Sequence, residues 1–158
     1  MTYEEFLKQK KQEFNYQGVS IHEEELNPNL FPFQKYAVAT ALRKGRFALF
    51  FDCGLGKTIM QLEWANQIAK RTRKPVLILA PLAVVEQTID EADSFGLDCQ
   101  QIKGDVFGPG VYITNYDQLK NIDTSLFAGV VLDESSILKG QGRKTSTAII
   151  QGFRSTQY

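Results

Sequence analysis

Short apolar runs alternate with stretches of helical periodicity along most of this chain, and this alternation restricts the fold more than any other feature. Residues 76–80 (Val-Leu-Ile-Leu-Ala) and 129–132 (Gly-Val-Val-Leu) are continuous apolar stretches, which are typical of strands covered on both faces. Helical patterns lie before and between them. Strands and helices in alternation predict parallel pairing through crossover helices, and therefore an α/β fold with a mostly parallel sheet flanked by helices.

Periodicity and breaker residues place the individual elements. Helices are expected over residues 2–14, 33–44, 58–70 and 83–95, and strands over residues 46–51, 76–80, 99–103, 111–114 and 129–132. Gly45 ends the second helix, while Pro75 and Pro81 bound the central strand. The remaining stretches read as loops, and the loop 104–110 is the richest in turn-forming residues.

The charge balance and the cysteine content narrow the class of protein. Eighteen basic residues face eighteen acidic ones, so no global positive field draws the chain onto nucleic acid, and any such contact must be local. Cys53 and Cys99 have neither the number nor the spacing of a disulfide framework or a zinc site. Because no apolar segment reaches the length of a signal peptide core or a membrane span, we expect a cytoplasmic protein without a membrane partner.

A glycine-rich turn after the expected strand 46–51 predicts a phosphate site. Ligands of α/β folds bind beyond the carboxyl ends of the strands, which is where this turn lies. Gly54 and Gly56 free the backbone so that successive amides can face one anion at the start of a helix. Lys57 can supply charge to the outer phosphates, and the Thr58 hydroxyl can bind the accompanying Mg²⁺. The predicted nucleotide cradle comprises Asp52, Cys53, Gly54, Leu55, Gly56, Lys57 and Thr58.

The glycine turn matches only part of the full phosphate-binding motif. The full pattern GxxxxGK[ST] has a glycine where this chain has Phe51, which points away from small-molecule kinases. The alternative interpretation is a glycine-rich turn with a solvated lysine.

Two carboxylates follow the last buried strand and complete the expected site. Asp133 would hold Mg²⁺, and Glu134 would orient and polarise the attacking water, which binding alone does not require. An acidic pair after a strand is also an ordinary turn sequence. Together with the cradle, however, it indicates nucleotide hydrolysis, with Lys57, Asp133 and Glu134 as catalytic residues and Thr58 and Asp133 as metal ligands.

Five segments resemble, in the right order, motifs of the first motor lobe of superfamily 2 helicases and translocases, in particular the Swi/Snf-related branch with its phage and mobile-element members. They are LFPFQKYAV, FFDCGLGKT, LILAPLAVVEQ, VYITNYDQL and VVLDESSILKG. The resemblance implies a RecA-like P-loop NTPase lobe over residues 31–158, preceded by a peripheral N-terminal segment, 1–30. It also implies ATP and Mg²⁺ as cofactors, DNA as a partner with RNA not excluded, and a second RecA-like lobe outside this chain.

The resemblance also assigns roles to single residues. Gln34 would read the adenine edge with support from Phe33. Contacts to the sugar-phosphate backbone of one nucleic-acid strand, which carry no sequence information, would come from Pro81, Leu82, Thr114, Asn115, Tyr116 and Lys139. Without the family, Pro81 reads as a strand terminator, Tyr116 as a core residue and Lys139 as a solvated one.

The chain departs from the family pattern at two places. Ser135 and Ser136 stand where the family has Ala-His or Gly-His after the acidic pair, so the coupling role of that histidine does not carry over to this chain. After a helix matched here by residues 144–153, the family continues into a strand that lies between the strands 46–51 and 129–132. This chain stops at Tyr158, so the lobe is expected to be incomplete at its C-terminus, poorly stable and slow in hydrolysis without the arginine of a second lobe.

Three functions are compatible with these patterns. The first is an ATP-driven DNA helicase or translocase lobe. The second is a nucleotide- or nucleic-acid-binding module without productive hydrolysis. The third is another P-loop NTPase such as an AAA+ ATPase, against which the segment around Gln34 argues.

Overall fold

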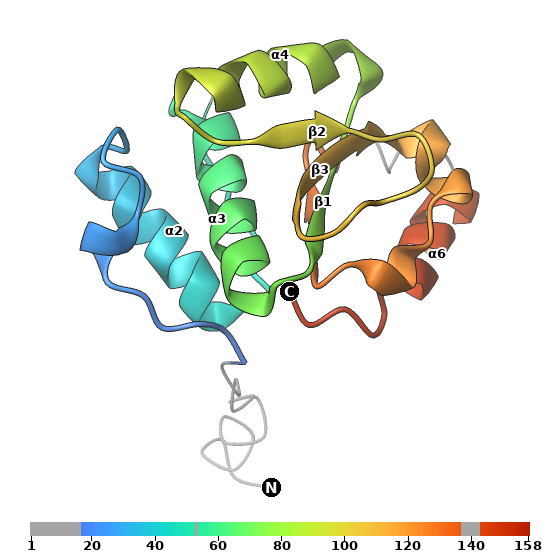
Figure 1. The fold of residues 1–158 in the computed structure, drawn as a ribbon, viewed down its shortest axis with the longest axis horizontal. Coiled ribbons are helices and arrows are strands. Elements are labelled where there is room, and N and C mark those ends of the chain that lie inside the picture. The colour runs from blue at the N-terminus through green and yellow to red at the C-terminus, as the bar shows by residue number, and fades with distance from the viewer. Residues whose placement is uncertain (1–16, 53, 137–142) are drawn as a thin grey trace, which may run out of the picture.

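The computed structural model describes residues 17–52, 54–136 and 143–158, which form an α/β structure (Figure 1). The expected helix 2–14, the cradle residue Cys53 and the expected nucleic-acid contact Lys139 lie outside the described residues. The other elements are considered below.

Four parallel strands form the central layer in the order β2-β3-β1-β4. They are β1 (Pro75–Ala80), β2 (Cys99–Gln101), β3 (Gly110–Asn115) and β4 (Gly129–Leu132). In β1, Val76 pairs with Val111 of β3 on one side and with Gly129 of β4 on the other. The parallel sheet expected from the alternation of elements is therefore confirmed, and β1 lies inside it because both of its faces are apolar.

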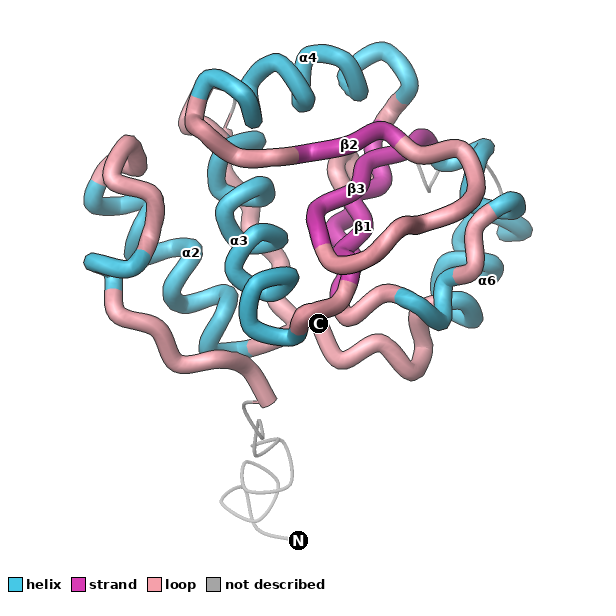
Figure 2. The backbone as a smooth tube through the Cα atoms, viewed as in Figure 1, coloured by secondary structure: helices cyan, strands magenta, loops and turns pink. Residues whose placement is uncertain are grey.

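Helices cover both faces of this sheet (Figure 2). Those on one face are α2 (Pro32–Lys44), α3 (Lys57–Thr72) and α4 (Leu82–Ser94), and α6 (Arg143–Gly152) covers the other. Three short 3-10 helices complete the fold: η1 (Glu23–Glu25), η2 (Tyr116–Asn121) and η3 (Thr124–Leu126). The expected helices 33–44, 58–70, 83–95 and 144–153 thus form within one or two residues of their expected bounds.

Alternation along β1 divides the core into two layers. Val76 and Ile78 pack with the helices α2, α3 and α4, whereas Leu77 and Leu79 pack with Phe153 and the rest of the α6 layer. Successive side chains of a strand point to opposite faces, so one continuous apolar run supplies both layers. Ile21, Leu26 and Leu30, which precede the expected domain, are buried in the first layer as well.

The prediction of a strand over residues 46–51 is wrong. These residues form no strand, and the Phe50 side chain is 91% exposed. A strand forms only where its backbone groups find a neighbour. The run 46–51 has no such neighbour in the described parts of the chain. β4 is the last strand of the sheet, and among the described residues its free side bonds to Tyr158 and not to the run: Tyr158 N donates to Ala128 O (3.2 Å), and Val130 N donates to Tyr158 O (3.1 Å).

An apolar slot separates the run 46–51 from β4. It has a volume of about 580 Å³ and is lined by residues of both sides, among them Phe47, Leu49, Trp64, Val130, Leu132 and Tyr158. The Arg46 guanidinium bonds to the carbonyls of Arg154 and Thr156, which places the start of the run at the same end of β4 as Tyr158. The run therefore passes beside β4 without pairing with it.

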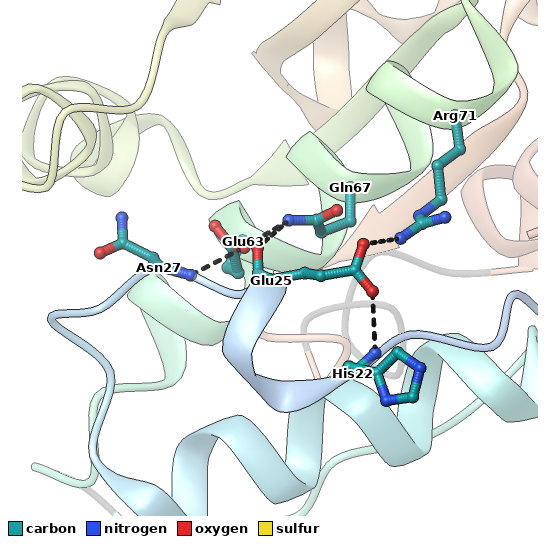
Figure 3. A network of polar contacts seen from close by, with 6 residues as sticks. All are labelled: His22, Glu25, Asn27, Glu63, Gln67 and Arg71. Carbon is teal, nitrogen blue, oxygen red and sulfur yellow. Dashed lines mark hydrogen bonds and ion pairs between the residues drawn. The ribbon is translucent and has the colours of Figure 1, made fainter.

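A polar network fixes the segment 22–27 against α3 (Figure 3). Glu63 is 1% exposed, and its Oε1 atom accepts hydrogen bonds from Asn27 N (3.1 Å) and Gln67 Nε2 (2.8 Å). At the surface, Arg71 pairs with Glu25 at 2.9 Å. Among the buried side-chain nitrogen and oxygen atoms of the described residues, Oε2 of Glu63 alone has no hydrogen-bond partner. This network anchors the helix that begins at the glycine turn.

Candidate functional site

The glycine turn leads directly into α3, as the cradle hypothesis requires. Gly54 (φ 83°) and Gly56 (φ 71°) both adopt positive backbone angles, and Gly56 is the residue that caps α3. The positive φ favours glycine at position 56, and a Cβ atom there would lie 2.4 Å from Nε2 of Gln34, so the Gln34 amide would have to move from its place at the turn. The amides of the first turn of a helix have no acceptor within that helix, so those of α3 face this loop and make it suitable for an anion.

Gln34 supports the turn from α2. Its side chain is 4% exposed, and both ends of its amide bond to backbone: Oε1 accepts from Phe31 N (2.9 Å) and Nε2 donates to Leu55 O (3.0 Å). Phe33, its expected helper, is exposed, stacks on Phe31 at 6.2 Å between ring centroids and lies 6.5 Å from the ring of Phe51. The residue expected to read adenine therefore holds the glycine turn in this structure.

The two polar side chains at the start of α3 have protein partners. Lys57 Nζ donates to the carbonyl of Phe51 at 3.2 Å, across the turn that it follows. Thr58 lies near Glu91 of α4: burial raises the pKa of Glu91 above its ordinary value, and the Thr58 hydroxyl, which can hydrogen-bond to that carboxyl, opposes the shift. Sequence reasoning did not identify Glu91, because only the fold brings α4 to Thr58.

Asp133 is held at three points. Its amide donates to Leu79 O (2.8 Å), its carbonyl accepts from the Tyr116 hydroxyl (2.6 Å), and its Oδ1 atom accepts from Gln61 Nε2 (2.9 Å). Gln61 lies one helical turn after Lys57, so the two residues share a face of α3. The structure thus brings the predicted cradle and the predicted metal carboxylate to the same part of α3.

Glu134 is exposed and adopts a left-handed backbone conformation, with φ of 52°. Ser136 Oγ donates a hydrogen bond of 2.6 Å to Glu134 Oε1. Ser136 occupies the position at which the resemblance places a histidine. The hydroxyl that replaces the imidazole thus contacts the carboxylate expected to activate water, a contact that the sequence pattern alone does not reveal.

The residues expected to touch nucleic acid differ in accessibility. Leu82 is exposed at the start of α4, just after Pro81. Thr114 is buried and donates to the Ile102 carbonyl at 2.7 Å. Asn115 caps η2, because its Oδ1 atom accepts hydrogen bonds from the backbone amides of Asp117 and Gln118. These residues lie at the carboxyl ends of β1 and β3, and their contact with nucleic acid stays a prediction.

Tyr116 is buried, as the interpretation without the family proposes. Burial, with smaller contributions from Asp133 and Glu134, raises the pKa of its hydroxyl to about 12. The raised pKa keeps the hydroxyl protonated, and therefore a hydrogen-bond donor, further into the alkaline range than an exposed tyrosine. Its donated bond to the Asp133 carbonyl connects the end of β3 to the end of β4.

The donor set suits Mg²⁺ bound together with phosphates rather than a metal held by protein alone. Within the described ranges, no group of three or more His, Cys, Asp or Glu residues could hold a metal ion. Mg²⁺ commonly takes one or two carboxylates and completes its shell with waters and phosphate oxygens. The predicted ligands, one carboxylate at Asp133 and one hydroxyl at Thr58 at the start of α3, match that kind of donor set, and their joint binding of the ion stays a prediction.

Comparison with known proteins identifies the family. A family model described as "Type III restriction enzyme, res subunit" matches residues 27–152, most of the chain. The comparison with curated proteins gave no match. In the parts of the chain that the structure describes, no helix has the length and apolar character needed to cross a bilayer. The match includes the glycine turn and the acidic pair, and the chain therefore belongs to this family, whose domain is a superfamily 2 helicase-like ATPase domain with a RecA-like fold.

Proposed function

We propose that this chain is the ATP-binding lobe of a DNA helicase or translocase of the Swi/Snf-related branch, which couples ATP hydrolysis to movement on DNA. The observation that carries the proposal is the Gln61–Asp133 contact of 2.9 Å, because it joins the helix that begins at the glycine turn to the acidic pair after β4. The family match supports the general class of activity.

The nucleotide would be bound by the turn and the start of α3. Backbone amides from Gly54 to Lys57 face the phosphates, and the partial positive charge at the helix N-terminus adds to their attraction. Lys57 would exchange its contact with the Phe51 carbonyl for the outer phosphates. Asp133 and Thr58 would hold Mg²⁺, which when bound neutralises charge on the phosphate oxygens. Thr58 would turn away from Glu91 to do so.

Glu134 would orient the attacking water. Its exposed carboxylate is held by Ser136, and its left-handed backbone directs the residue away from the path of β4. Strained backbone of this kind is concentrated at functional sites. A second RecA-like lobe would contribute the arginine that stabilises the developing charge on the phosphate.

DNA would bind at the carboxyl ends of β1 and β3. Pro81 and Leu82 follow β1, Asn115 is the last residue of β3, and Leu82 is exposed. Contacts there to the sugar-phosphate backbone suit a motor that must move along any sequence. RNA presents similar phosphates and is the other outcome that a binding assay would detect.

A second candidate function is a nucleotide-binding module without productive hydrolysis. The observation in its favour is that Ser136 replaces the histidine of the family and engages the Glu134 carboxylate at 2.6 Å. A carboxylate oxygen that remains bound to Ser136 is not free to accept a hydrogen bond from the attacking water, so ATP would bind without turnover.

The test is binding of a fluorescent ATP analogue with Mg²⁺, followed by phosphate release with and without DNA. Lys57→Ala should weaken binding about tenfold or more, as expected for the loss of a charge-assisted contact. Lys70→Ala, at the exposed far end of α3, is the matched control and should bind like the wild type. If the protein binds the analogue but releases no phosphate above the level of the Glu134→Gln variant, the second candidate is favoured. If Lys57→Ala and Lys70→Ala affect binding equally, both candidates are contradicted.

A further inference from the structure

We propose that Gln61 is a positioning residue, which orients the Asp133 carboxylate for a divalent cation. The proposal rests on the nucleotide function proposed above and adds to it a residue outside the cradle motif. The contact that identifies Gln61 is its donated hydrogen bond, from Nε2 to Asp133 Oδ1, at 2.9 Å.

The backbone of Asp133 is already fixed without Gln61. Leu79 O accepts from its amide at 2.8 Å, and the Tyr116 hydroxyl donates to its carbonyl at 2.6 Å. These two bonds lie on either side of the Cα atom, so the rotations within the side chain remain to be set. Gln61 sets them, because its amide binds one carboxylate oxygen and thereby fixes the direction of the other, Oδ2.

A donor of this kind has a known chemical effect. Side chains that hydrogen-bond to a metal-binding carboxylate orient it toward the metal, and removing one commonly costs about 10- to 100-fold in metal affinity. An amide suits this position because it donates without adding charge, so it neither repels the cation nor neutralises the carboxylate. Gln61 is partly buried, which shields the bond from competing water.

The position of Gln61 on α3 relates the carboxylate to the cradle. Gln61 follows Lys57 by four residues, so both side chains project from the same face of the helix. One rigid helix therefore carries the lysine expected at the phosphates and the amide that aims the metal ligand. A purely structural role for Gln61 would tie α3 to β4 equally well, and the experiment must separate these two roles.

The experiment compares Gln61→Met with Gln67→Met. Methionine has nearly the same length, favours helices and cannot donate. Gln67 is a matched control because it lies on the same helix and donates the same kind of bond to another carboxylate, Glu63, at 2.8 Å. For the wild type and both variants, binding of a fluorescent ATP analogue is measured in EDTA and then as a function of Mg²⁺ concentration, together with the melting temperature.

We expect Gln61→Met to raise the Mg²⁺ concentration at half-maximal effect by about 10- to 100-fold while leaving binding in EDTA unchanged. Gln67→Met should lower the melting temperature and leave the Mg²⁺ midpoint in place. In Gln61→Asn the side chain is one methylene shorter, so its amide does not reach Asp133. This variant should behave like Gln61→Met and replaces it in the experiment if the methionine variant does not fold.

Two results would overturn the inference in different ways. A wild-type Mg²⁺ midpoint in Gln61→Met, or an equal shift in Gln67→Met, would show that Gln61 has a structural role only, while nucleotide binding stands. Failure of the wild-type protein to bind the analogue at any Mg²⁺ concentration would refute the proposed function itself, and the role of Gln61 with it.

Discussion

The hydroxyl of Tyr116 donates a hydrogen bond of 2.6 Å to the backbone carbonyl of Asp133. This bond joins the segment after β3, where nucleic-acid contacts are proposed, to the acidic pair after β4, where the metal is proposed. The end of one strand thus fixes the position of the residue that ends the other. Because the tyrosine ring is 5% exposed, little water is available to replace the bond if it is lost.

Tyr116→Phe should destabilise the protein. The substitution keeps the ring and its packing but leaves the Asp133 carbonyl without its donor, which costs about 1–3 kcal/mol when the acceptor is buried. Urea unfolding at neutral pH measures the loss. Tyr36→Phe is the control, because Tyr36 is 65% exposed and should tolerate the change without effect. Equal stabilities of the two variants would refute a structural role for the hydroxyl.

Stability should decrease in alkaline solution. Burial raises the pKa of both Tyr116 and Cys99 to about 12, whereas the unfolded chain ionises near 10 and 8.5 respectively. Folding therefore favours the protonated forms, so their contribution is intact below these unfolded values and is lost as pH rises toward 12. The free energy of unfolding, measured with urea at several values between about pH 8 and pH 11, checks this expectation. A Tyr116→Phe, Cys99→Ala double variant should show a shallower decline, and an unchanged slope would contradict the assignment.

Glu63 should contribute to stability through its Oε1 atom. Glu63→Ala removes the acceptor shared by Asn27 and Gln67, so Asn27 N loses this partner and Gln67 Nε2 keeps only the Glu25 carbonyl; we expect a loss of about 1–3 kcal/mol. Glu63→Gln keeps an oxygen for both donors, so its loss should be smaller. Thermal unfolding of the two variants, with the exposed Glu24→Ala as a control, measures the difference. A glutamine variant less stable than the alanine variant would contradict the stabilising role of the Oε1 acceptor.

Phe50→Ser should reduce self-association without lowering stability. The Phe50 ring is almost fully exposed beside the apolar slot, so the substitution removes apolar surface from water and breaks no packing. Light scattering and sedimentation should show less association than in the wild type, at an unchanged melting temperature. In contrast, Phe127→Ser removes a buried ring and should unfold the protein. A lower melting temperature in Phe50→Ser would indicate that the ring packs in solution.

The elements that the sequence predicts correctly are those whose signal is local. The continuous apolar run 76–80 indicates a doubly covered strand whichever neighbours it has, and the helix beginning at Lys57 follows from its own periodicity. The run 46–51 has the same apolar character but forms no strand. Strand formation depends on hydrogen-bond partners in other parts of the chain, and composition does not report whether these are present.

The contacts within the candidate site depend on the fold and could not be predicted. The sequence indicates the glycine turn and the acidic pair, because each is a short motif with its own chemistry. Gln61 carries a weak signal, its four-residue spacing from Lys57, which has meaning only once Asp133 is known to lie beside α3. The proximity of Thr58 to Glu91 follows from the packing of α4, and neither residue type predicts it from the sequence.

The free side of β4 has a consequence for how this sheet can grow. Among residues 17–52, 54–136 and 143–158, Tyr158 alone bonds to this side, so the other backbone groups there offer a template onto which an extended peptide of any origin could be added, and the slot already provides apolar space for its side chains. The opposite border, β2, is only three residues long and is a much poorer template. Recruitment of a further strand would therefore proceed in one direction, next to the strand that carries the acidic pair.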